Sequence, residues 1–157
     1  MKTLVIGLGN PLLGDDGVGI EAVNMLRTKL RSRFGDVDVE AMNSSGFEVA
    51  ERMLGYERAI VVDAIAGRMP GTVHAFGVEQ LQPTIHFTNP HDMNIQTAIE
   101  WLKSHENFPR IVKFVAVEIL PENEFREGLS EKVRQALPVV EKIIMKELEG
   151  GKRNADK

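Results

Sequence analysis

The segment that most constrains the fold of this chain runs from position 4 to position 19. It reads Leu-Val-Ile-Gly-Leu-Gly-Asn-Pro-Leu-Leu-Gly-Asp-Asp-Gly-Val-Gly, so an apolar run breaks into glycines and ends near two adjacent carboxylates, Asp15 and Asp16. This pattern is typical of a strand, a tight loop and the start of a helix. Open α/β sheets place their sites in such loops, so we expect the functional site here.

Apolar runs alternate with helical periodicity along the rest of the chain. This alternation predicts an α/β three-layer sandwich, in which a mostly parallel twisted sheet of about five strands carries helices on both faces. A turn at Pro70-Gly71 indicates that the following strand is an antiparallel edge strand. Pro138 is expected to kink the last helix. The expected strands are 2–8, 37–42, 58–65, 72–78 and 111–119, and the expected helices are 17–34, 47–54, 92–104 and a last one from about 130.

The length of 157 residues suits one globular domain, expected over 1–149, with a disordered polar tail over 150–157. The formal net charge of -4 argues against a nucleic-acid partner. Neither a signal segment nor a membrane span is evident, so we expect a cytoplasmic protein that does not insert into membranes. We also expect a monomer. The chain has no cysteine, so any metal must be bound through nitrogen and oxygen.

Three aspartates are candidate functional residues. Asp15 and Asp16 could simply cap a helix, and that interpretation explains the pair taken alone. Asp63 lies in the apolar run 59–65, where a buried charge is costly unless it is paired or reaches the edge of the sheet. If both strands are parallel, their ends meet at one edge, so Asp16 and Asp63 could converge.

An imidazole beside two carboxylates would complete a site for a metal of borderline hardness. His74 and His105 are expected at the surface, whereas His86 and His91 flank a loop that precedes a helix. Each of the latter two, taken singly, is explained as an ordinary loop histidine. Two carboxylates and one imidazole would leave coordination positions open, as metal-assisted hydrolysis requires.

Three motifs together resemble the [NiFe]-hydrogenase maturation endopeptidases over nearly the whole chain. They are the segment 7–19, the strand end Val61-Val62-Asp63-Ala64, and Pro90-His91-Asp92. The resemblance implies that Asp16, Asp63 and His91 bind nickel and form the catalytic site. It also implies a peptidase that removes a C-terminal extension from the hydrogenase large-subunit precursor after nickel insertion, with the nickel supplied by that precursor.

One loop departs from the family pattern. Many members carry an acidic residue, two glycines and a threonine after the second strand, whereas this chain has Asn43-Ser44-Ser45-Gly46. We assign these four residues no role.

Two alternatives come from other classes of protein. Peptidyl-tRNA hydrolases also begin with a strand followed by Gly-Leu-Gly-Asn-Pro, as at 7–11, but their catalytic histidine follows soon afterwards, and this chain has none before His74. A non-catalytic chaperone would bind its partner without cleaving it and would keep the metal triad only as a vestige. A dinucleotide-binding module would use the glycines to hold a phosphate at the helix start. The third glycine of that fingerprint is missing, and Asp15 and Asp16 would repel a pyrophosphate.

Overall fold

A computed structural model describes residues 1–44, 46–81, 94–121 and 124–153 of the chain. Within these residues one sheet has the strand order β2-β1-β3-β5-β4. All pairings are parallel except that of β4 with β5, so β4 is the antiparallel edge strand predicted from the Pro-Gly turn. The strands are β1 (Thr3–Leu8), β2 (Val37–Met42), β3 (Arg58–Ala66), β4 (Val73–Gly77) and β5 (Ile111–Ile119).

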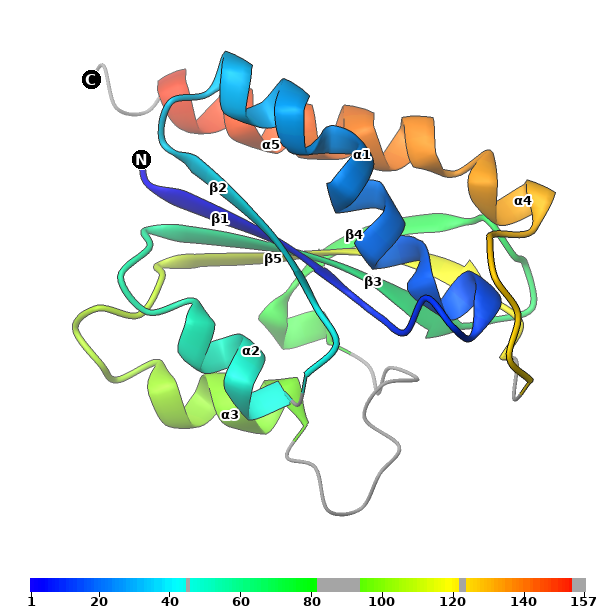
Figure 1. Ribbon diagram of the computed structural model, residues 1–157. Coiled ribbons are helices and arrows are strands. Elements are labelled where there is room, and N and C mark those ends of the chain that lie inside the picture. Colours follow the sequence, from blue (N-terminus) through cyan, green and yellow to red (C-terminus); the bar gives the residue numbers. More distant parts are fainter. Residues whose placement is uncertain (45, 82–93, 122–123, 154–157) are drawn as a thin grey trace.

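Helices cover both faces of the sheet (Figure 1). One face packs against α1 and α5, and the other against α2 and α3, with a separate apolar core on each side. This arrangement confirms the predicted three-layer α/β sandwich. The helices are η1 (Gly14–Gly17), α1 (Val18–Arg33), α2 (Gly46–Arg52), η2 (Val78–Gln80), α3 (Ile95–Leu102), α4 (Glu131–Arg134) and α5 (Leu137–Arg153), where η marks a 3-10 helix.

The sequence predicted the buried strands closely, because they are apolar on both faces. β2 and β5 have the expected bounds, and β3 is one residue longer than expected. α3 occupies 95–102 of the helix expected over 92–104. Positions 92 and 93 of that helix, and most of the loop expected over 79–89, lie outside the described residues.

The expected last helix is divided in two. α4 ends at Arg134 and α5 begins at Leu137, so Pro138 lies in the first turn of α5 instead of kinking a continuous helix. A proline is tolerated there because the first backbone N–H groups of a helix have no partner within it.

The predicted disordered tail is wrong for residues 150–153, which belong to α5. The reason is a contact with the sheet. Arg58 Nη1 donates a hydrogen bond to the carbonyl of Glu147 at 2.5 Å, and a Cβ on Gly151 would lie 2.6 Å from the same nitrogen. The end of α5 is therefore packed against the start of β3, while residues 154–157 lie outside the described part.

Among the described residues, no helix is both long enough and apolar enough to cross a membrane.

Candidate functional site at the carboxyl edge of the sheet

The loop after β1 is held in one shape by hydrogen bonds of its own backbone and side chains. Asn10 accepts at its side-chain oxygen from the Leu12 N–H at 3.1 Å, and at its carbonyl from the Leu13 N–H at 3.0 Å. The Leu13 carbonyl in turn accepts from the Asp16 N–H at 3.2 Å. This series of turns leads into η1, where the two carboxylates lie.

Glycines allow this loop and α1 to lie directly against the sheet. A Cβ on Gly7 would lie 2.1 Å from the carbonyl oxygen of Gly19, and one on Gly19 would lie 2.3 Å from that of Val62. Gly9 has a φ of +146°, and a Cβ there would lie 2.2 Å from the carbonyl oxygen of Asp16. The start of α1 therefore lies closer to β1 and β3 than any residue with a Cβ at these positions would allow.

Asp16 is buried, with 5% of its surface exposed. Its Oδ2 accepts a hydrogen bond from the Asn10 N–H at 3.1 Å, so the loop itself orients this carboxylate. The contact closes the loop between the end of β1 and η1.

Asp15 is also buried, and it contacts a distant segment. Its Oδ1 accepts from the Ser130 N–H and its Oδ2 from the Ser130 hydroxyl, both at 2.7 Å. Both carboxylates lie in the first turn of η1, as the capping interpretation expects, and Asp15 in addition holds Ser130, the residue before α4.

Asp63 lies near the carboxyl end of β3 with 3% of its surface exposed. Ala59 and Val61 face the α2 and α3 side of the sheet, so the alternation of a strand places Asp63 on that face too. Its Oδ1 accepts from the Ala64 N–H at 2.7 Å. Residues of η1 contact β3, which places the loop of Asp16 beside the end of the strand that carries Asp63.

The predicted third site residue, His91, lies outside the described residues, and so does His86. Within the described ranges, no three His, Asp or Glu side chains form a group that could hold a metal. The structure therefore brings the segments of Asp16 and Asp63 together, while the part of His91 stays a prediction.

His74 lies at the surface, as expected, with 43% of its side chain exposed, and it lies level with Asp63 in the sheet. Both His74 and Asp63 pair with Ala116 of β5, so the three residues form one row across the sheet. His74 Nε2 lies 3.2 Å from Glu118 Oε1. Strand register is needed to see this pair, and the sequence alone does not provide it.

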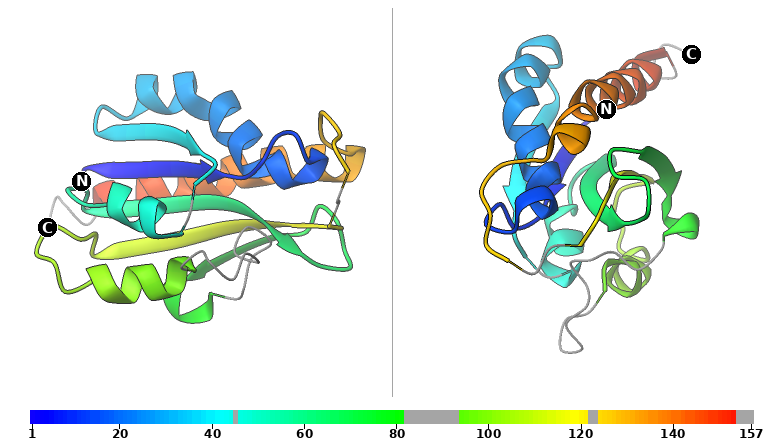
Figure 2. Two further views of the ribbon diagram at one scale, coloured as in Figure 1. Left: turned by 60° about the horizontal axis from the view of Figure 1, so that its bottom comes forward. Right: turned by 90° about the vertical axis from the view of Figure 1, so that its right-hand side faces the viewer.

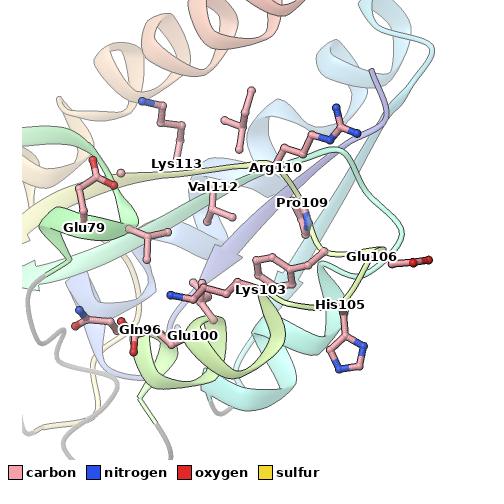
Figure 3. A pocket seen from close by; sticks show the side chains of 15 residues that line it. Glu79, Gln96, Glu100, Lys103, His105, Glu106, Pro109, Arg110, Val112 and Lys113 are labelled. Atoms are coloured by element: carbon pink, nitrogen blue, oxygen red, sulfur yellow. The ribbon is translucent and has the colours of Figure 1, made fainter.

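An open cavity of about 890 Å³ lies at the other end of β5 (Figure 3). Charged side chains surround an apolar floor there, and they come from η2, α3, the loop after α3 and the start of β5. The lining includes Glu79, Lys103 and Lys113, but neither Asp16 nor Asp63. This cavity is therefore separate from the two carboxylates.

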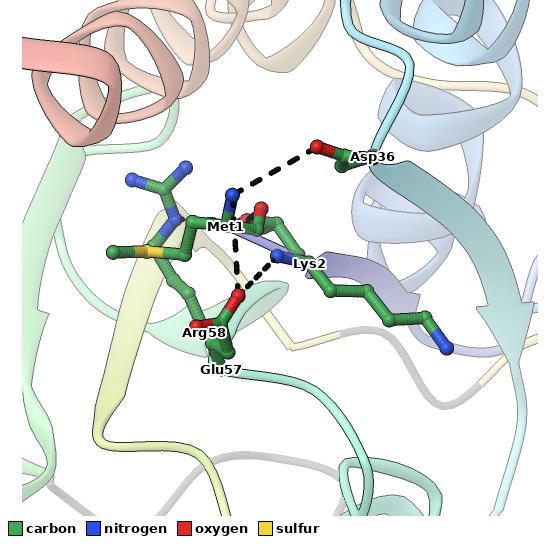
Figure 4. A network of polar contacts seen from close by, with 6 residues as sticks. Met1, Lys2, Asp36, Glu57 and Arg58 are labelled. Carbon is green, nitrogen blue, oxygen red and sulfur yellow. Dashed lines mark hydrogen bonds and ion pairs between the residues drawn. The ribbon is translucent and has the colours of Figure 1, made fainter. Parts of the chain in front are cut away.

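The amino edge of the sheet carries a network of polar contacts (Figure 4). The terminal ammonium of Met1 lies 3.8 Å from Asp36 and 3.9 Å from Glu57, and the Lys2 N–H donates to Glu57 at 2.7 Å. Arg58 Nε donates to the Thr3 hydroxyl at 3.1 Å, and burial lowers the pKa of this guanidinium. These contacts join the starts of β1 and β3, at the edge opposite Asp16 and Asp63.

Comparison with known proteins identifies the family. The family model described as "Hydrogenase maturation protease" matches residues 25–147. The "Hydrogenase 2 maturation protease" of Escherichia coli (strain K12) is 30% identical over 159 residues, which cover 96% of this chain and 93% of the relative.

Solved structures agree with this assignment. The hydrogenase maturating endopeptidase HybD from E. coli superposes with a TM-score of 0.75 at 24% identity, covering 96% of this chain and 94% of that one, and shares the fold. An endopeptidase from Escherichia coli, solved in solution, gives a TM-score of 0.71 at 27% identity with the same coverage. Because its relatives are hydrogenase maturation proteases and an endopeptidase, this α/β protein is a peptidase. The chain belongs to the hydrogenase maturation protease family.

Proposed function

We propose that this peptidase removes the C-terminal extension of a [NiFe]-hydrogenase large-subunit precursor after nickel has been inserted. Family membership supports the reaction class. One structural observation supports the site: Asp16 and Asp63 are both buried, and their segments are in contact at the carboxyl edge of the sheet. Buried carboxylates at this position of an open α/β sheet are typical of a functional site.

In this proposal Asp16, Asp63 and His91 bind the nickel of the precursor, which is part of the substrate. Two carboxylate oxygens and one imidazole nitrogen are suitable donors for Ni²⁺, and the chain has no thiolate to compete with them. Three protein ligands leave coordination positions for groups of the precursor. A precursor without nickel would lack this contact, and selectivity for the loaded form would follow.

The protein's own residues hold the carboxylates in place. The Asn10 N–H orients Asp16, and the Ala64 N–H orients Asp63. Asp15 anchors the same loop through Ser130. Polarisation of the scissile carbonyl, or of a water, is the chemistry that nickel supplies when it is bound.

The proposal is tested by the intact mass of a cognate large-subunit precursor after incubation with the protein. Nickel-loaded and nickel-free precursors are compared, with the wild type and with Asp63→Asn. We expect loss of a C-terminal fragment only with nickel and only with the wild type. Asn is nearly isosteric and keeps an oxygen to accept from the Ala64 N–H, so the variant should stay folded.

Asp36→Asn is the matched control, because Asp36 lies at the opposite edge and its side chain is 77% exposed. This control should cleave like the wild type. Cleavage of nickel-free precursor would contradict the role of the metal. If the protein binds its cognate precursors but cleaves none of them, the proposed reaction is contradicted and a chaperone role is favoured.

The same proposal places the protein in the cytoplasm and expects it to act as a monomer. Sedimentation velocity of the purified protein tests the second point, and fractionation of cells that produce it tests the first.

A further inference from the structure

Large apolar side chains are exposed around the candidate site. Leu12 follows β1, Met69 follows β3, and Leu120 and Phe125 follow β5, so all four lie in loops at the carboxyl edge of the parallel strands. Their exposed fractions are 53%, 68%, 57% and 84% in that order. We call these four residues the apolar rim.

Leu12 and Phe125 lie side by side. Leu13 and Arg126 form a parallel bridge, the Arg126 N–H donates to the Leu12 carbonyl at 2.9 Å, and the Gly14 N–H donates to the Arg126 carbonyl at 2.7 Å. In a parallel bridge, the residues one position earlier on each strand point to the same side. Figure 2 shows the two segments running next to each other at this end of the molecule.

The other half of the apolar rim is also joined by hydrogen bonds. The Met69 N–H donates to Glu118 Oε2 at 3.1 Å, and the Gly67 N–H donates to the Ile119 carbonyl at 3.1 Å. The loop that carries Met69 is therefore tied to the end of β5, where Leu120 follows.

The apolar rim is continuous with the candidate site. Leu12 belongs to the same hydrogen-bonded loop as Asp16, and the segment of Phe125 continues to Ser130, which contacts Asp15. A cavity of about 220 Å³, lined by Pro11 and Gly128, lies beside η1 on this surface. The hydrogen-bonded loops that lead from the apolar rim to the carboxylates offer one continuous surface to a polypeptide that lies across the edge.

We propose that the apolar rim binds apolar side chains of the large-subunit precursor close to the bond that is cleaved. This inference rests on the proposed function and adds a second recognition element beside the metal. Exposed apolar side chains that lie side by side, as Leu12 and Phe125 do, are a mark of protein interaction surfaces. Contact with the apolar rim would align the polypeptide with Asp16 and Asp63. The apolar rim would contact side chains near the cleaved bond and not the bond itself.

The test measures initial cleavage rates against the concentration of nickel-loaded precursor. Phe125→Ser and Leu12→Ser should each raise KM about tenfold, equivalent to about 1.4 kcal/mol, with kcat retained. Trp101→Ser is the matched control, because Trp101 is 67% exposed on α3, away from the carboxyl edge. The control should keep the KM of the wild type, and urea unfolding should show that all three variants are folded.

Three results would overturn the inference. The first is a KM for both apolar rim variants equal to that of Trp101→Ser. The second is a fall in kcat at unchanged KM, which would mean that these residues shape the site and do not bind substrate. The third is a wild-type dimer that Phe125→Ser dissociates, which would make the apolar rim a contact between copies. In all three the wild type still cleaves, whereas a wild type that cleaves no precursor contradicts the proposed function itself.

Discussion

Asp15 and Ser130 are separated by 115 positions in the sequence, yet both oxygens of the Asp15 carboxylate accept hydrogen bonds from Ser130. One bond comes from the backbone N–H and the other from the hydroxyl, and both measure 2.7 Å. The contact joins the loop that carries Asp16 to the start of α4, so the C-terminal part of the chain supports the candidate site.

A double-mutant cycle measures the strength of this contact. Asp15→Ala should lower the free energy of unfolding by about 3 kcal/mol, since hydrogen bonds to a charged group contribute about 1.5–3 kcal/mol each. Ser130→Ala removes only the hydroxyl bond and should cost about half as much. The double variant should show a coupling energy of about 1.5 kcal/mol in urea unfolding. Additive effects would show that the two side chains do not support each other.

Gly19→Ala should destabilise the protein and also disturb the site. A Cβ at this position would lie 2.3 Å from the Val62 carbonyl oxygen and 2.4 Å from that of Leu8, so α1 must move away from the sheet. Forcing extra atoms into a packed interface costs about 1–3 kcal/mol. Chemical denaturation should reveal that loss, and cleavage should fall with it because η1 directly precedes α1.

Gly35→Ala is the control for this substitution, since no heavy atom lies within 4 Å of the Cβ it would add. It should leave stability unchanged or raise it by about 0.5 kcal/mol. Equal stability of the two alanine variants would refute the close approach of α1 to the sheet.

Pro138→Ala should change stability by no more than about 1 kcal/mol, because Pro138 lies in the first turn of α5 and interrupts no hydrogen bond within the helix. A proline introduced further along, as in Lys142→Pro, should cost about 3 kcal/mol or more. Thermal unfolding of the two variants separates these expectations. A large loss with Pro138→Ala would mean that the proline itself sets the break between α4 and α5.

Tyr56 should make the protein less stable at alkaline pH. Burial raises the pKa of its hydroxyl, and the hydrogen bond to Asp38 at 2.9 Å adds to this effect. The folded protein thus keeps this proton at pH values where the unfolded chain, with an ordinary tyrosine pKa of about 10, has released it. Stability from this group is complete below about pH 10 and is lost as the pH rises further.

Tyr56→Phe should therefore cost about 1 kcal/mol at neutral pH and show a smaller alkaline loss than the wild type. Urea unfolding across the alkaline range measures the difference. The chain has one tyrosine, so tyrosinate absorbance reports this group alone. A constant difference between the two proteins at all pH values would contradict the raised pKa.

The sequence predicted the sheet well because its central strands are buried on both faces and are apolar throughout. It also indicated that Asp16 and Asp63 could converge if their strands were parallel, and the strands are parallel. The partner of Asp15 and the pairing of His74 with Glu118 could not be predicted, because each joins segments that only the folded topology brings together. The place of His91 in the site stays a prediction, as that residue lies outside the described part of the chain.

The contact between Asp15 and Ser130 also has a consequence for the order of folding. β1 and the loop after it are synthesised early, but Ser130 emerges from the ribosome only when most of the polypeptide has been made. Contacts between residues far apart in sequence slow folding, because the intervening chain must first be ordered. A nascent chain ending before Ser130 would contain both Asp16 and Asp63 but would lack the contact that anchors the loop of Asp16. We therefore expect the peptidase activity of the protein to appear late in folding, after the C-terminal helices have docked.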